Sequence, residues 1–245
     1  MTSSQEKQPS QLGDDLDLLS DQAVRTLDTL ARALHLKDAE LEPALDAIVS
    51  TAVAAVETAQ HAGLILVVRG ELVPQVTTGA PPQLLDELQQ KLRDGPCLAA
   101  AVGQSLVRID DMRDDGRWPG FAAEALNLGV QSMLCVPLWV HERRLGTLSL
   151  YAAHPTAFTG QHERVTHVFA TLAAIALAEA QRTDQLRTAL ASRDVIGQAK
   201  GILMERNRVT ADDAFRSLSQ ASQNVNMKLT EVARLLVETG ELPGG

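Results

Sequence analysis

The sequence predicts an α+β fold: an antiparallel sheet flanked by helices, joined by one long helix to a small C-terminal three-helix unit. Three observations lead to this prediction. Short apolar segments with strand character gather between residues 62 and 152, and helical patterns lie on both sides of them. From Glu163 to Met204 the chain has no proline, which favours one continuous helix. Two shorter helical patterns follow that helix.

The chain before the first strand is expected to be helical. Apolar residues, mostly leucines, recur at spacings of three and four over residues 16–36, and apolar residues at the same spacing continue over residues 41–58. Both segments therefore predict amphipathic helices. Residues 1–15 are rich in Ser, Gln and Asp, so they are predicted to form a disordered acidic tail.

The middle of the chain alternates between strand and helix signals. In order, the sequence predicts strands at 62–69 and 72–78, a helix at 81–92, a strand at 106–109, a helix at 119–128, and strands at 131–140 and 145–152. The first two strands read as a hairpin, and the pair Pro81-Pro82 is suited to the first turn of a helix. Pro137 cannot donate a backbone hydrogen bond, so it predicts a sheet edge or a bulge.

Capping residues place the last helices. Thr210 is expected to cap a helix that runs through Ala221, and Thr230 to cap a final helix that ends at Gly240. The domain boundary falls inside the long helix, because no Gly- or Ser-rich linker interrupts it. We therefore expect an α+β domain at 37–180 and a helical domain at 181–245, preceded by the separate helix at 16–36.

Composition and charge narrow the class of protein. Hydrophobic residues make up 45 % and charged residues 22 %, which is typical of a globular protein. No apolar run approaches the about 20 residues that a transmembrane helix needs, and the N-terminus does not resemble a signal peptide. Two cysteines exclude a disulfide framework, so a reduced, cytoplasmic protein is expected. The net charge of −9 lies outside residues 184–245, where eight basic residues balance eight acidic ones, which suggests two modules with different partners.

The common motifs for catalysis are missing from the sequence. The patterns G-x-x-x-x-G-K-[ST], G-x-G-x-x-G and G-x-S-x-G do not occur. His162 and His167 are five residues apart, whereas two zinc ligands on one helix need a spacing of four. The run of aspartates at 110–115 has Arg113 where a calcium-binding loop needs an oxygen ligand. We therefore predict no enzymatic activity and no metal site, and the sequence identifies no cofactor.

The two cysteines have two interpretations. Cys97 follows an Asp-Gly-Pro turn and Cys135 lies in an apolar strand, so both can be small buried hydrophobes. The alternative is a thiol sensor in which Cys97 is the more accessible residue. Neither cysteine has a cationic neighbour in the sequence that would lower its pKa.

Two stretches in the α+β region form a recognisable series, DGPCLAAAVGQSLVRIDDMRDDGRWPGF and then GVQSMLCVPLWVHERRLGTLSLYA, followed by a closing helix. In this order and spacing they resemble a GAF domain over about residues 41–178. The resemblance implies a signal-receiving domain whose sheet can carry a small-molecule pocket. The candidate lining residues are Cys97, Trp118, Phe121, Met133, Cys135 and Tyr151. An ordinary core without a ligand is the open alternative.

The C-terminal stretch SRDVIGQAKGILMERNRVTADDAFRSLSQASQNVNMKLTEVARLLV is the sharper match. Over about residues 190–237 it resembles an ANTAR domain. The resemblance implies a three-helix module that binds paired short hairpins in nascent RNA and prevents a terminator from forming. On this basis the candidate RNA-binding residues are Arg193, Lys200, Arg206, Ser222, Asn226 and Lys228.

The residue chemistry supports RNA binding only in part. Arg193 and Lys200 are seven residues apart, so they share a face of a helix. Between the last two helices, the side chains of Asn224, Asn226 and Lys228 could donate hydrogen bonds to base edges. Basic residues on a helix can equally be a solvated face. Met204, Phe215 and Leu236 are assigned to the core, so stacking of bases on aromatic side chains is not expected.

The combined prediction is a signal-responsive antitermination regulator. Leucines along residues 16–36 and along the long helix exceed what one small sheet needs to cover, so we expect a homodimer with imperfect coiled-coil character. One alternative is a ligand- or redox-sensing protein that acts through protein–protein contacts without RNA. The other is an enzyme with its active site in the sheet domain, for which the sequence supplies no nucleophile–base pair.

Overall fold

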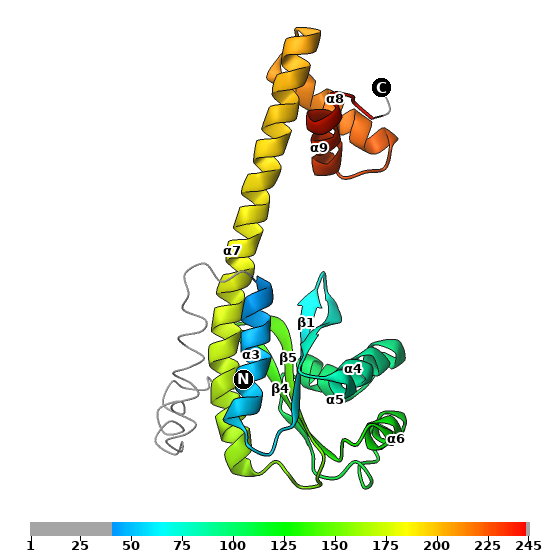
Figure 1. Ribbon diagram of the computed structural model, residues 1–245, viewed down its shortest axis with the longest axis vertical. Coiled ribbons are helices and arrows are strands. Elements are labelled where there is room, and N and C mark those ends of the chain that lie inside the picture. The colour runs from blue at the N-terminus through cyan, green and yellow to red at the C-terminus, as the bar shows by residue number, and fades with distance from the viewer. Residues whose placement is uncertain (1–40, 244–245) are drawn as a thin grey trace, which may run out of the picture. The chain divides into compact units, whose positions relative to one another are not determined.

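The computed structural model describes residues 41–243, and Figure 1 shows the arrangement of the elements. The predicted tail at 1–15 and the predicted helix at 16–36 lie outside the described residues. The chain divides into two compact units, one ending at Gln181 and the other beginning at Arg182.

The first unit is built on a five-stranded antiparallel sheet in the order β2-β1-β5-β4-β3. The strands are β1 (His61–Val68), β2 (Glu71–Thr77), β3 (Val107–Ile109), β4 (Ser132–Val140) and β5 (Arg143–Ala152). All five predicted strands are present, which confirms the α+β class. The hairpin formed by β4 and β5 supplies the long central pair of the sheet.

Helices cover both faces of the sheet (Figure 1). On one face, α3 (Leu41–Ala55) and the first part of α7 (Gly160–Asn207) pack against alternating strand residues such as Leu64, Leu148 and Leu150. The opposite face carries α4 (Ala80–Leu92), α5 (Pro96–Gly103) and α6 (Pro119–Asn127). Because side chains alternate along β5, Ser149 and Tyr151 face this second layer. The two apolar cores therefore lie on opposite sides of one sheet.

Pro137 is accommodated where β4 loses a neighbour. In the sheet, β3 pairs only with residues 133–135 of β4, so Pro137 lies beyond the end of β3 and is paired on the β5 side with Thr147. The register shifts one residue later, between Leu138 and Trp139. The absent N–H of proline therefore costs no ladder hydrogen bond on the β3 side. The prediction of an edge or a bulge at this position is confirmed.

Helix α5 was not predicted. It begins with Pro96 and has eight residues, and Cys97, Ala100 and Ala101 are buried. A run this short and uniformly apolar carries no periodic pattern, because nearly every position can face a core. The structure therefore adds a helix that brings Cys97 onto the sheet.

The second unit contains the end of α7, then α8 (Ala211–Asn224) and α9 (Leu229–Thr239). Its core consists of Ala199, Leu203, Ala214, Leu218, Ala221, Val232, Ala233 and Leu236. Thr210 caps α8 as predicted, since its hydroxyl accepts the N–H of Asp213. The prediction that Thr230 caps α9 is wrong, because α9 begins at Leu229 and the N-cap is Lys228, two residues before Thr230, without a side-chain bond. None of the described helices, α7 included, has an apolar stretch that could span a membrane.

Candidate functional site

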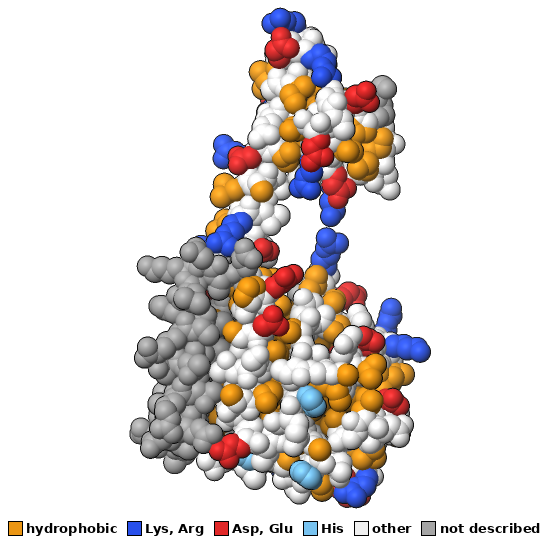
Figure 2. Space-filling view, viewed as in Figure 1, with side chains coloured by type: hydrophobic (Ala, Val, Ile, Leu, Met, Phe, Trp, Pro, Cys, Tyr) orange, Lys and Arg blue, Asp and Glu red, His pale blue; other side chains and the backbone are white. Residues whose placement is uncertain are grey.

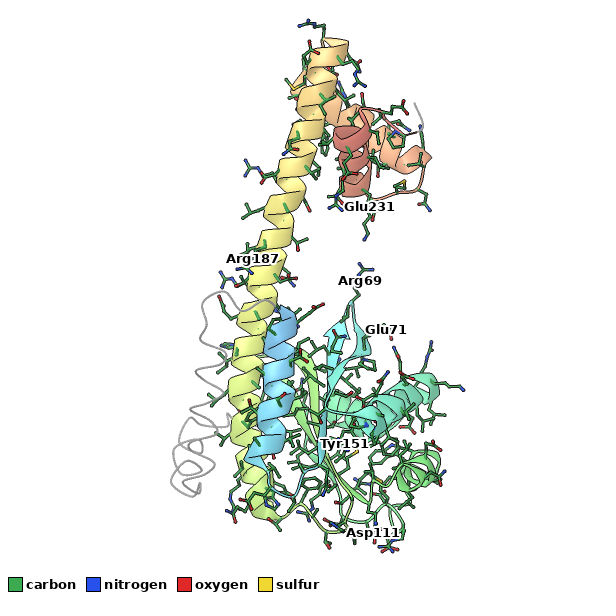
Figure 3. All side chains as sticks on the ribbon, viewed as in Figure 1. Arg69, Glu71, Asp111, Tyr151, Arg187 and Glu231 are labelled. Atoms are coloured by element: carbon green, nitrogen blue, oxygen red, sulfur yellow. The ribbon has the colours of Figure 1, made fainter. Side chains whose placement is uncertain are left out.

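A cluster of buried polar side chains lies between the sheet and the helices α4 and α5. Asp86 and Gln89 come from α4, Cys97 from α5, and Ser149 and Tyr151 from β5. Each of the five is at most 2 % exposed. Tyr151, labelled in Figure 3, lies in the region between the sheet and these helices. Polar groups in such a place are stable only when they are hydrogen-bonded to one another.

Cys97 is the centre of this cluster. Its sulfur lies 3.0 Å from Gln89 Nε2, 3.1 Å from Ser149 Oγ and 3.8 Å from the Tyr151 hydroxyl. Its backbone is held as well: the Cys97 N–H donates to Gln89 Oε1 at 2.8 Å, and its carbonyl accepts from Thr147 Oγ1 at 3.0 Å. Helix α5 is therefore fixed to both α4 and β5 through one residue.

Asp86 completes the cluster as its acidic member. Tyr151 donates its hydroxyl hydrogen to Asp86 Oδ1 at 2.9 Å, and Asp86 Oδ2 has no partner among the described residues. Burial, and the charge of a nearby Cys97 thiolate, raise the pKa of Asp86 well above its ordinary value of 3.8. Burial also raises the pKa of Tyr151. The carboxyl and the phenol therefore favour their neutral forms.

Two glycines make room for the cluster. Gly95 has φ +148°, and a Cβ there would come within 2.4 Å of Gln89 Cγ. A Cβ on Gly63 would come within 2.9 Å of Asp86 Oδ2. Both positions are therefore restricted to glycine by the side chains of α4 that face the cluster.

The six predicted pocket residues are near one another but fill the space themselves. Cys97, Phe121, Met133, Cys135 and Tyr151 are buried in the second core, and Trp118 packs at its margin. The Trp118 indole donates to Asp94 Oδ1 at 3.0 Å, and the Arg117 guanidinium lies 4.7 Å from the centre of its ring.

A cavity of about 420 Å³ lies elsewhere in the same unit, lined by Val67, Gly70, Glu71, Leu72, Gln90, Arg93, Leu98, Val102 and Arg144. None of the six predicted pocket residues lines it. Its residues come from the β1–β2 hairpin, from α4 and α5, and from the start of β5, so no continuous sequence pattern marks it.

In the acidic loop after β3, aspartates form ion pairs with arginines of the same loop. Asp111 binds Arg113 at 2.8 Å and Asp115 binds Arg117 at 2.6 Å, and Asp111 lies at the edge of the unit (Figure 3). These partners lower the pKa of both aspartates. Within residues 41–243, no three His, Cys, Asp or Glu side chains gather closely enough to hold a metal ion.

In the second unit, Lys200 and Phe215 form a contact between α7 and α8. Lys200 Nζ lies 5.9 Å from the centre of the Phe215 ring, and Lys200 is half-buried. Phe215 is 42 % exposed and Met204 is 38 % exposed, so their assignment to the core is wrong, whereas Leu236 is buried as predicted. Helix α8 presents one apolar stripe, and Ala214, Leu218 and Ala221 already fill it. Phe215, next to Ala214, faces outward instead.

The other candidate RNA-binding residues separate into two groups. Arg206 and Ser222 make internal hydrogen bonds: Arg206 Nη1 donates to the Gly240 carbonyl at 2.6 Å, and Ser222 Oγ donates to the Met227 carbonyl at 2.5 Å. Arg193, Asn226 and Lys228 are exposed, and Asn226 has φ +51° in the α8–α9 turn.

These residues do not form one cluster. Lys228 lies at the N-terminal end of α9 and Arg206 contacts its C-terminal end, which are about 18 Å apart at the rise of an α-helix. Arg208 pairs with Glu205 at 3.4 Å and Arg216 pairs with Asp213, so some basic side chains are neutralised locally. Figure 2 shows blue and red side chains interspersed over the visible face of this unit. The contact of half-buried Lys200 with exposed Phe215 is therefore its most distinctive surface feature.

The sheet order, the two helical layers and the three-helix C-terminal unit together define an α+β domain joined by α7 to a small helical domain. Comparison with family models agrees: a GAF domain matches residues 38–178, and an ANTAR domain matches residues 184–237. The chain belongs to the GAF domain family and carries a C-terminal ANTAR domain. This combination is the architecture of a signal-responsive regulator.

Solved structures support the fold of the first unit. The GAF domain of an Acinetobacter phosphoenolpyruvate-protein phosphotransferase is 16 % identical, with a TM-score of 0.55 over 68 % of this chain and 99 % of that one. The corresponding domain from Coxiella burnetii is 19 % identical, with a TM-score of 0.52 over 68 % of this chain and 99 % of that one. At these identities the likeness is one of fold. A search of curated protein sequences finds no match to this chain.

Proposed function

We propose that this protein regulates transcription by antitermination, through binding of its ANTAR domain to hairpins of nascent RNA in the cytoplasm. ANTAR domains in general bind RNA, and the match covers all three helices of the second unit. In this proposal the GAF domain receives a signal, and α7, which runs without a break from one domain into the other, carries the response. The protein performs no catalysis.

The observation that carries the proposal is the contact between Lys200 and Phe215. The Phe215 ring is partly exposed and lies beside an ammonium group, so one ligand could meet a flat apolar face and a positive charge together. Stacking was not expected from the sequence because Phe215 was assigned to the core, but its exposed ring makes stacking possible. Every base has a flat face that can stack on such a ring, at about 1–3 kcal/mol per base. The ammonium group of Lys200 beside it would bind the phosphate of the same nucleotide. We propose that the pair holds one unpaired base of a hairpin loop.

The exposed candidates extend this surface. Arg193 lies seven residues before Lys200 on α7, so it projects from the same side about 10 Å away, a distance suited to a second phosphate. Asn226 and Lys228 are exposed in the α8–α9 turn and have free donors for base edges. We propose that these four residues contact RNA directly. Arg206 and Ser222 support the domain through the Gly240 and Met227 carbonyls.

The signal is proposed to be a small molecule that binds the GAF domain. The cavity of about 420 Å³ is large enough for one, and Arg93, Arg144 and Glu71 give it charged groups of both signs. The six residues first considered for a pocket remain the alternative location, which a ligand would reach only by moving part of the second core.

A homodimer is proposed through the exposed side of α7. Leu172, Ile175, Leu186 and Leu190 are 37–60 % exposed along this helix. Leu172 and Leu186 are two heptads apart, as residues at one position of a coiled coil are, although Glu179 and Arg182 fall between them. A second copy would cover the leucines with the same residues of its own helix. Two ANTAR domains in one dimer would hold two adjacent hairpins by linkage.

Selection of bound RNA from a transcript pool tests the proposed function. The full chain is expected to enrich tandem short hairpins, and Phe215→Ala to weaken binding of an enriched RNA by about tenfold, since stacking is lost. Phe215→Leu keeps an apolar side chain of similar size and serves as the matched control for stability. Enrichment of no RNA would contradict the proposal and favour a regulator that acts through protein–protein contacts.

Sedimentation of the full chain tests the proposed dimer. Leu186→Asp places a charge in the exposed stripe and is expected to give monomers, whereas Thr188→Asp, at an exposed position on the opposite side of α7, leaves the dimer intact. A wild-type chain that sediments as a monomer would contradict the proposed dimer.

A further inference from the structure

The proposed RNA function leaves the polar cluster around Cys97 without a role. A buried cysteine that serves only to fill space is surrounded by apolar groups. Here the sulfur has an amide, a hydroxyl and a phenol within 4 Å, and the sulfur of Cys135 lies 3.9 Å away. Both thiols are free. The two cysteines are 38 residues apart in the sequence, and the fold brings them together from α5 and β4.

We propose that Cys97 and Cys135 are an oxidisable dithiol: a small peroxide converts Cys97 to a sulfenic acid, and Cys135 then closes an intramolecular disulfide. The inference rests on the contact between the two sulfurs and on the polar groups around one of them. It does not depend on RNA binding, and it assigns a modification site to the GAF domain.

The two cysteines have different surroundings, which assigns their roles. Burial would raise the pKa of Cys97, but hydrogen bonds with Cys135, Ser149, Gln89 and Tyr151 outweigh it and lower the pKa to about 7. Burial and the neighbouring Cys97 raise the pKa of Cys135 well above its ordinary 9.0. Cys97 is therefore the nucleophile, because a thiolate attacks peroxide and a thiol does not. Cys135 is the resolving thiol.

Three titratable groups face the Cys97 sulfur, each from a different element. They are Asp86 on α4, Cys135 on β4 and Tyr151 on β5. The raised pKa values of Asp86 and Tyr151 keep both groups neutral near pH 7, so neither opposes the thiolate with a charge of its own. The pH dependence of the reaction is thus set by Cys97.

The chemistry is balanced with a peroxide as the only co-reactant. Cys97 sulfur attacks one peroxide oxygen, the O–O bond breaks, and the thiol proton leaves with the other oxygen as water. Cys135 sulfur then attacks the Cys97 sulfenic acid, the S–O bond breaks, and the Cys135 proton leaves with that oxygen as a second water. Two thiols lose two electrons, and the peroxide is reduced by two.

The geometry favours a small oxidant and a short movement. A disulfide bond is about 2.05 Å long, so the sulfurs must approach by about 2 Å. Cys97 is the second residue of the short helix α5, and that helix can supply the movement. Both thiols are at most 1 % exposed, so hydrogen peroxide, not much larger than water, can reach them through local opening. A bulky disulfide such as oxidised glutathione cannot.

Treatment of the folded full chain with hydrogen peroxide tests the proposal. The mass is expected to fall by two hydrogen atoms, with one cross-linked peptide that joins Cys97 to Cys135 and with recovery by dithiothreitol. In Cys135→Ala, a sulfenic-acid trap is expected to label Cys97, whereas Cys97→Ala leaves Cys135 unlabelled. A disulfide between two chains, a label on Cys135 in Cys97→Ala, or thiols that react only after unfolding in denaturant would overturn the proposal.

A pH profile checks the roles without any variant. The rate of thiol loss is expected to rise about tenfold from pH 6 to pH 8 and to level off, as the ionisation of a thiol with pKa about 7 requires. Ser149→Ala, which removes one hydrogen-bond partner of the sulfur, is expected to shift this profile to higher pH. A rate that climbs about a hundredfold over the same range, as for a thiol of pKa near 9, would overturn the assignment of Cys97 as the nucleophile.

Discussion

Arg206 Nη1 donates a 2.6 Å hydrogen bond to the backbone carbonyl of Gly240, where α9 ends. Gly240 has φ +76° and its N–H donates to the Leu236 carbonyl, so the end of α9 is closed by a left-handed residue. The Arg206 guanidinium supplies a donor for the Gly240 carbonyl and places a positive charge at the C-terminal, negative end of the α9 dipole. One arginine thus joins α7 to α9 across 34 residues of sequence.

Arg206→Ala is expected to destabilise the ANTAR domain by about 1 kcal/mol, because a charge-assisted hydrogen bond is lost from an exposed position. Urea denaturation of the full chain, followed through the C-terminal transition, measures the change. Arg208→Ala is the matched control, since Arg208 pairs only with exposed Glu205 and such pairs contribute little. Equal stability of the two variants would contradict a capping role for Arg206.

Thr210→Ala is expected to cost about 1 kcal/mol of stability, because the Asp213 N–H in the first turn of α8 loses its acceptor. Thr210→Ser keeps the hydroxyl and should retain most of that stability. Thermal melting of the two variants beside the wild type makes the comparison. A serine variant as unstable as the alanine variant would show that the methyl group of Thr210, not its hydroxyl, is important.

The elements of the fold could be predicted because their signals are local. Alternation along residues 145–152 and the spacing of apolar residues over 41–58 reflect burial on one face, and the structure has β5 and α3 there. The cap was predicted at Thr230 because threonine is a common N-cap residue. In the structure Lys228 occupies the N-cap, and only its backbone takes part. Such a cap has no sequence signature, since no side chain takes part in it.

The sites could be predicted only where they depend on neighbours in the sequence. The candidate RNA-binding residues came from a motif, but whether Arg206 points to solvent or to Gly240 depends on where α9 ends. Cys97 and Cys135 are 38 residues apart, and their contact depends on how α5 lies on β4. Phe215 was assigned to the core because large apolar side chains are usually buried. In the structure Ala214 and Leu218 occupy the core-facing side of α8, and Phe215 lies on the exposed side.

Gly95→Ala is expected to destabilise the GAF domain by about 2 kcal/mol or more, from strain at φ +148° and from displacement of the Gln89 side chain. Gly70→Ala is the matched control, since Gly70 has φ +88° but nothing within 4 Å of a new Cβ. Denaturation midpoints separate the two effects. If both variants lose the same stability, the close contact with Gln89 contributes nothing.

Asp86→Asn is expected to gain stability relative to wild type as the pH rises above about 4. Burial raises the pKa of Asp86 in the folded state above its ordinary 3.8, so the folded protein holds this proton more tightly than the unfolded chain. The stabilisation from that proton is complete below pH 3.8 and is lost as the pH rises toward the raised value, with a slope of at most about 1.4 kcal/mol per pH unit. Asparagine can still accept from Tyr151 and has no such dependence.

Denaturation at a series of pH values measures the difference between Asp86→Asn and wild type. Asp46→Asn, which removes an exposed carboxylate of α3, controls for the loss of one charge. A difference that stays constant from pH 4 to pH 8 would mean that the Asp86 carboxyl titrates as it does in the unfolded chain.

The most direct test is the affinity of the full chain for a selected tandem-hairpin RNA, measured over a range of salt concentrations. Lys200→Ala is expected to weaken binding about tenfold and to lower the slope of log affinity against log salt by about 0.7–0.9, the contribution of one phosphate contact. Arg208→Ala, which removes a cation already paired with Glu205, should change both quantities much less. RNA binding that is unaffected by Lys200→Ala would contradict the account.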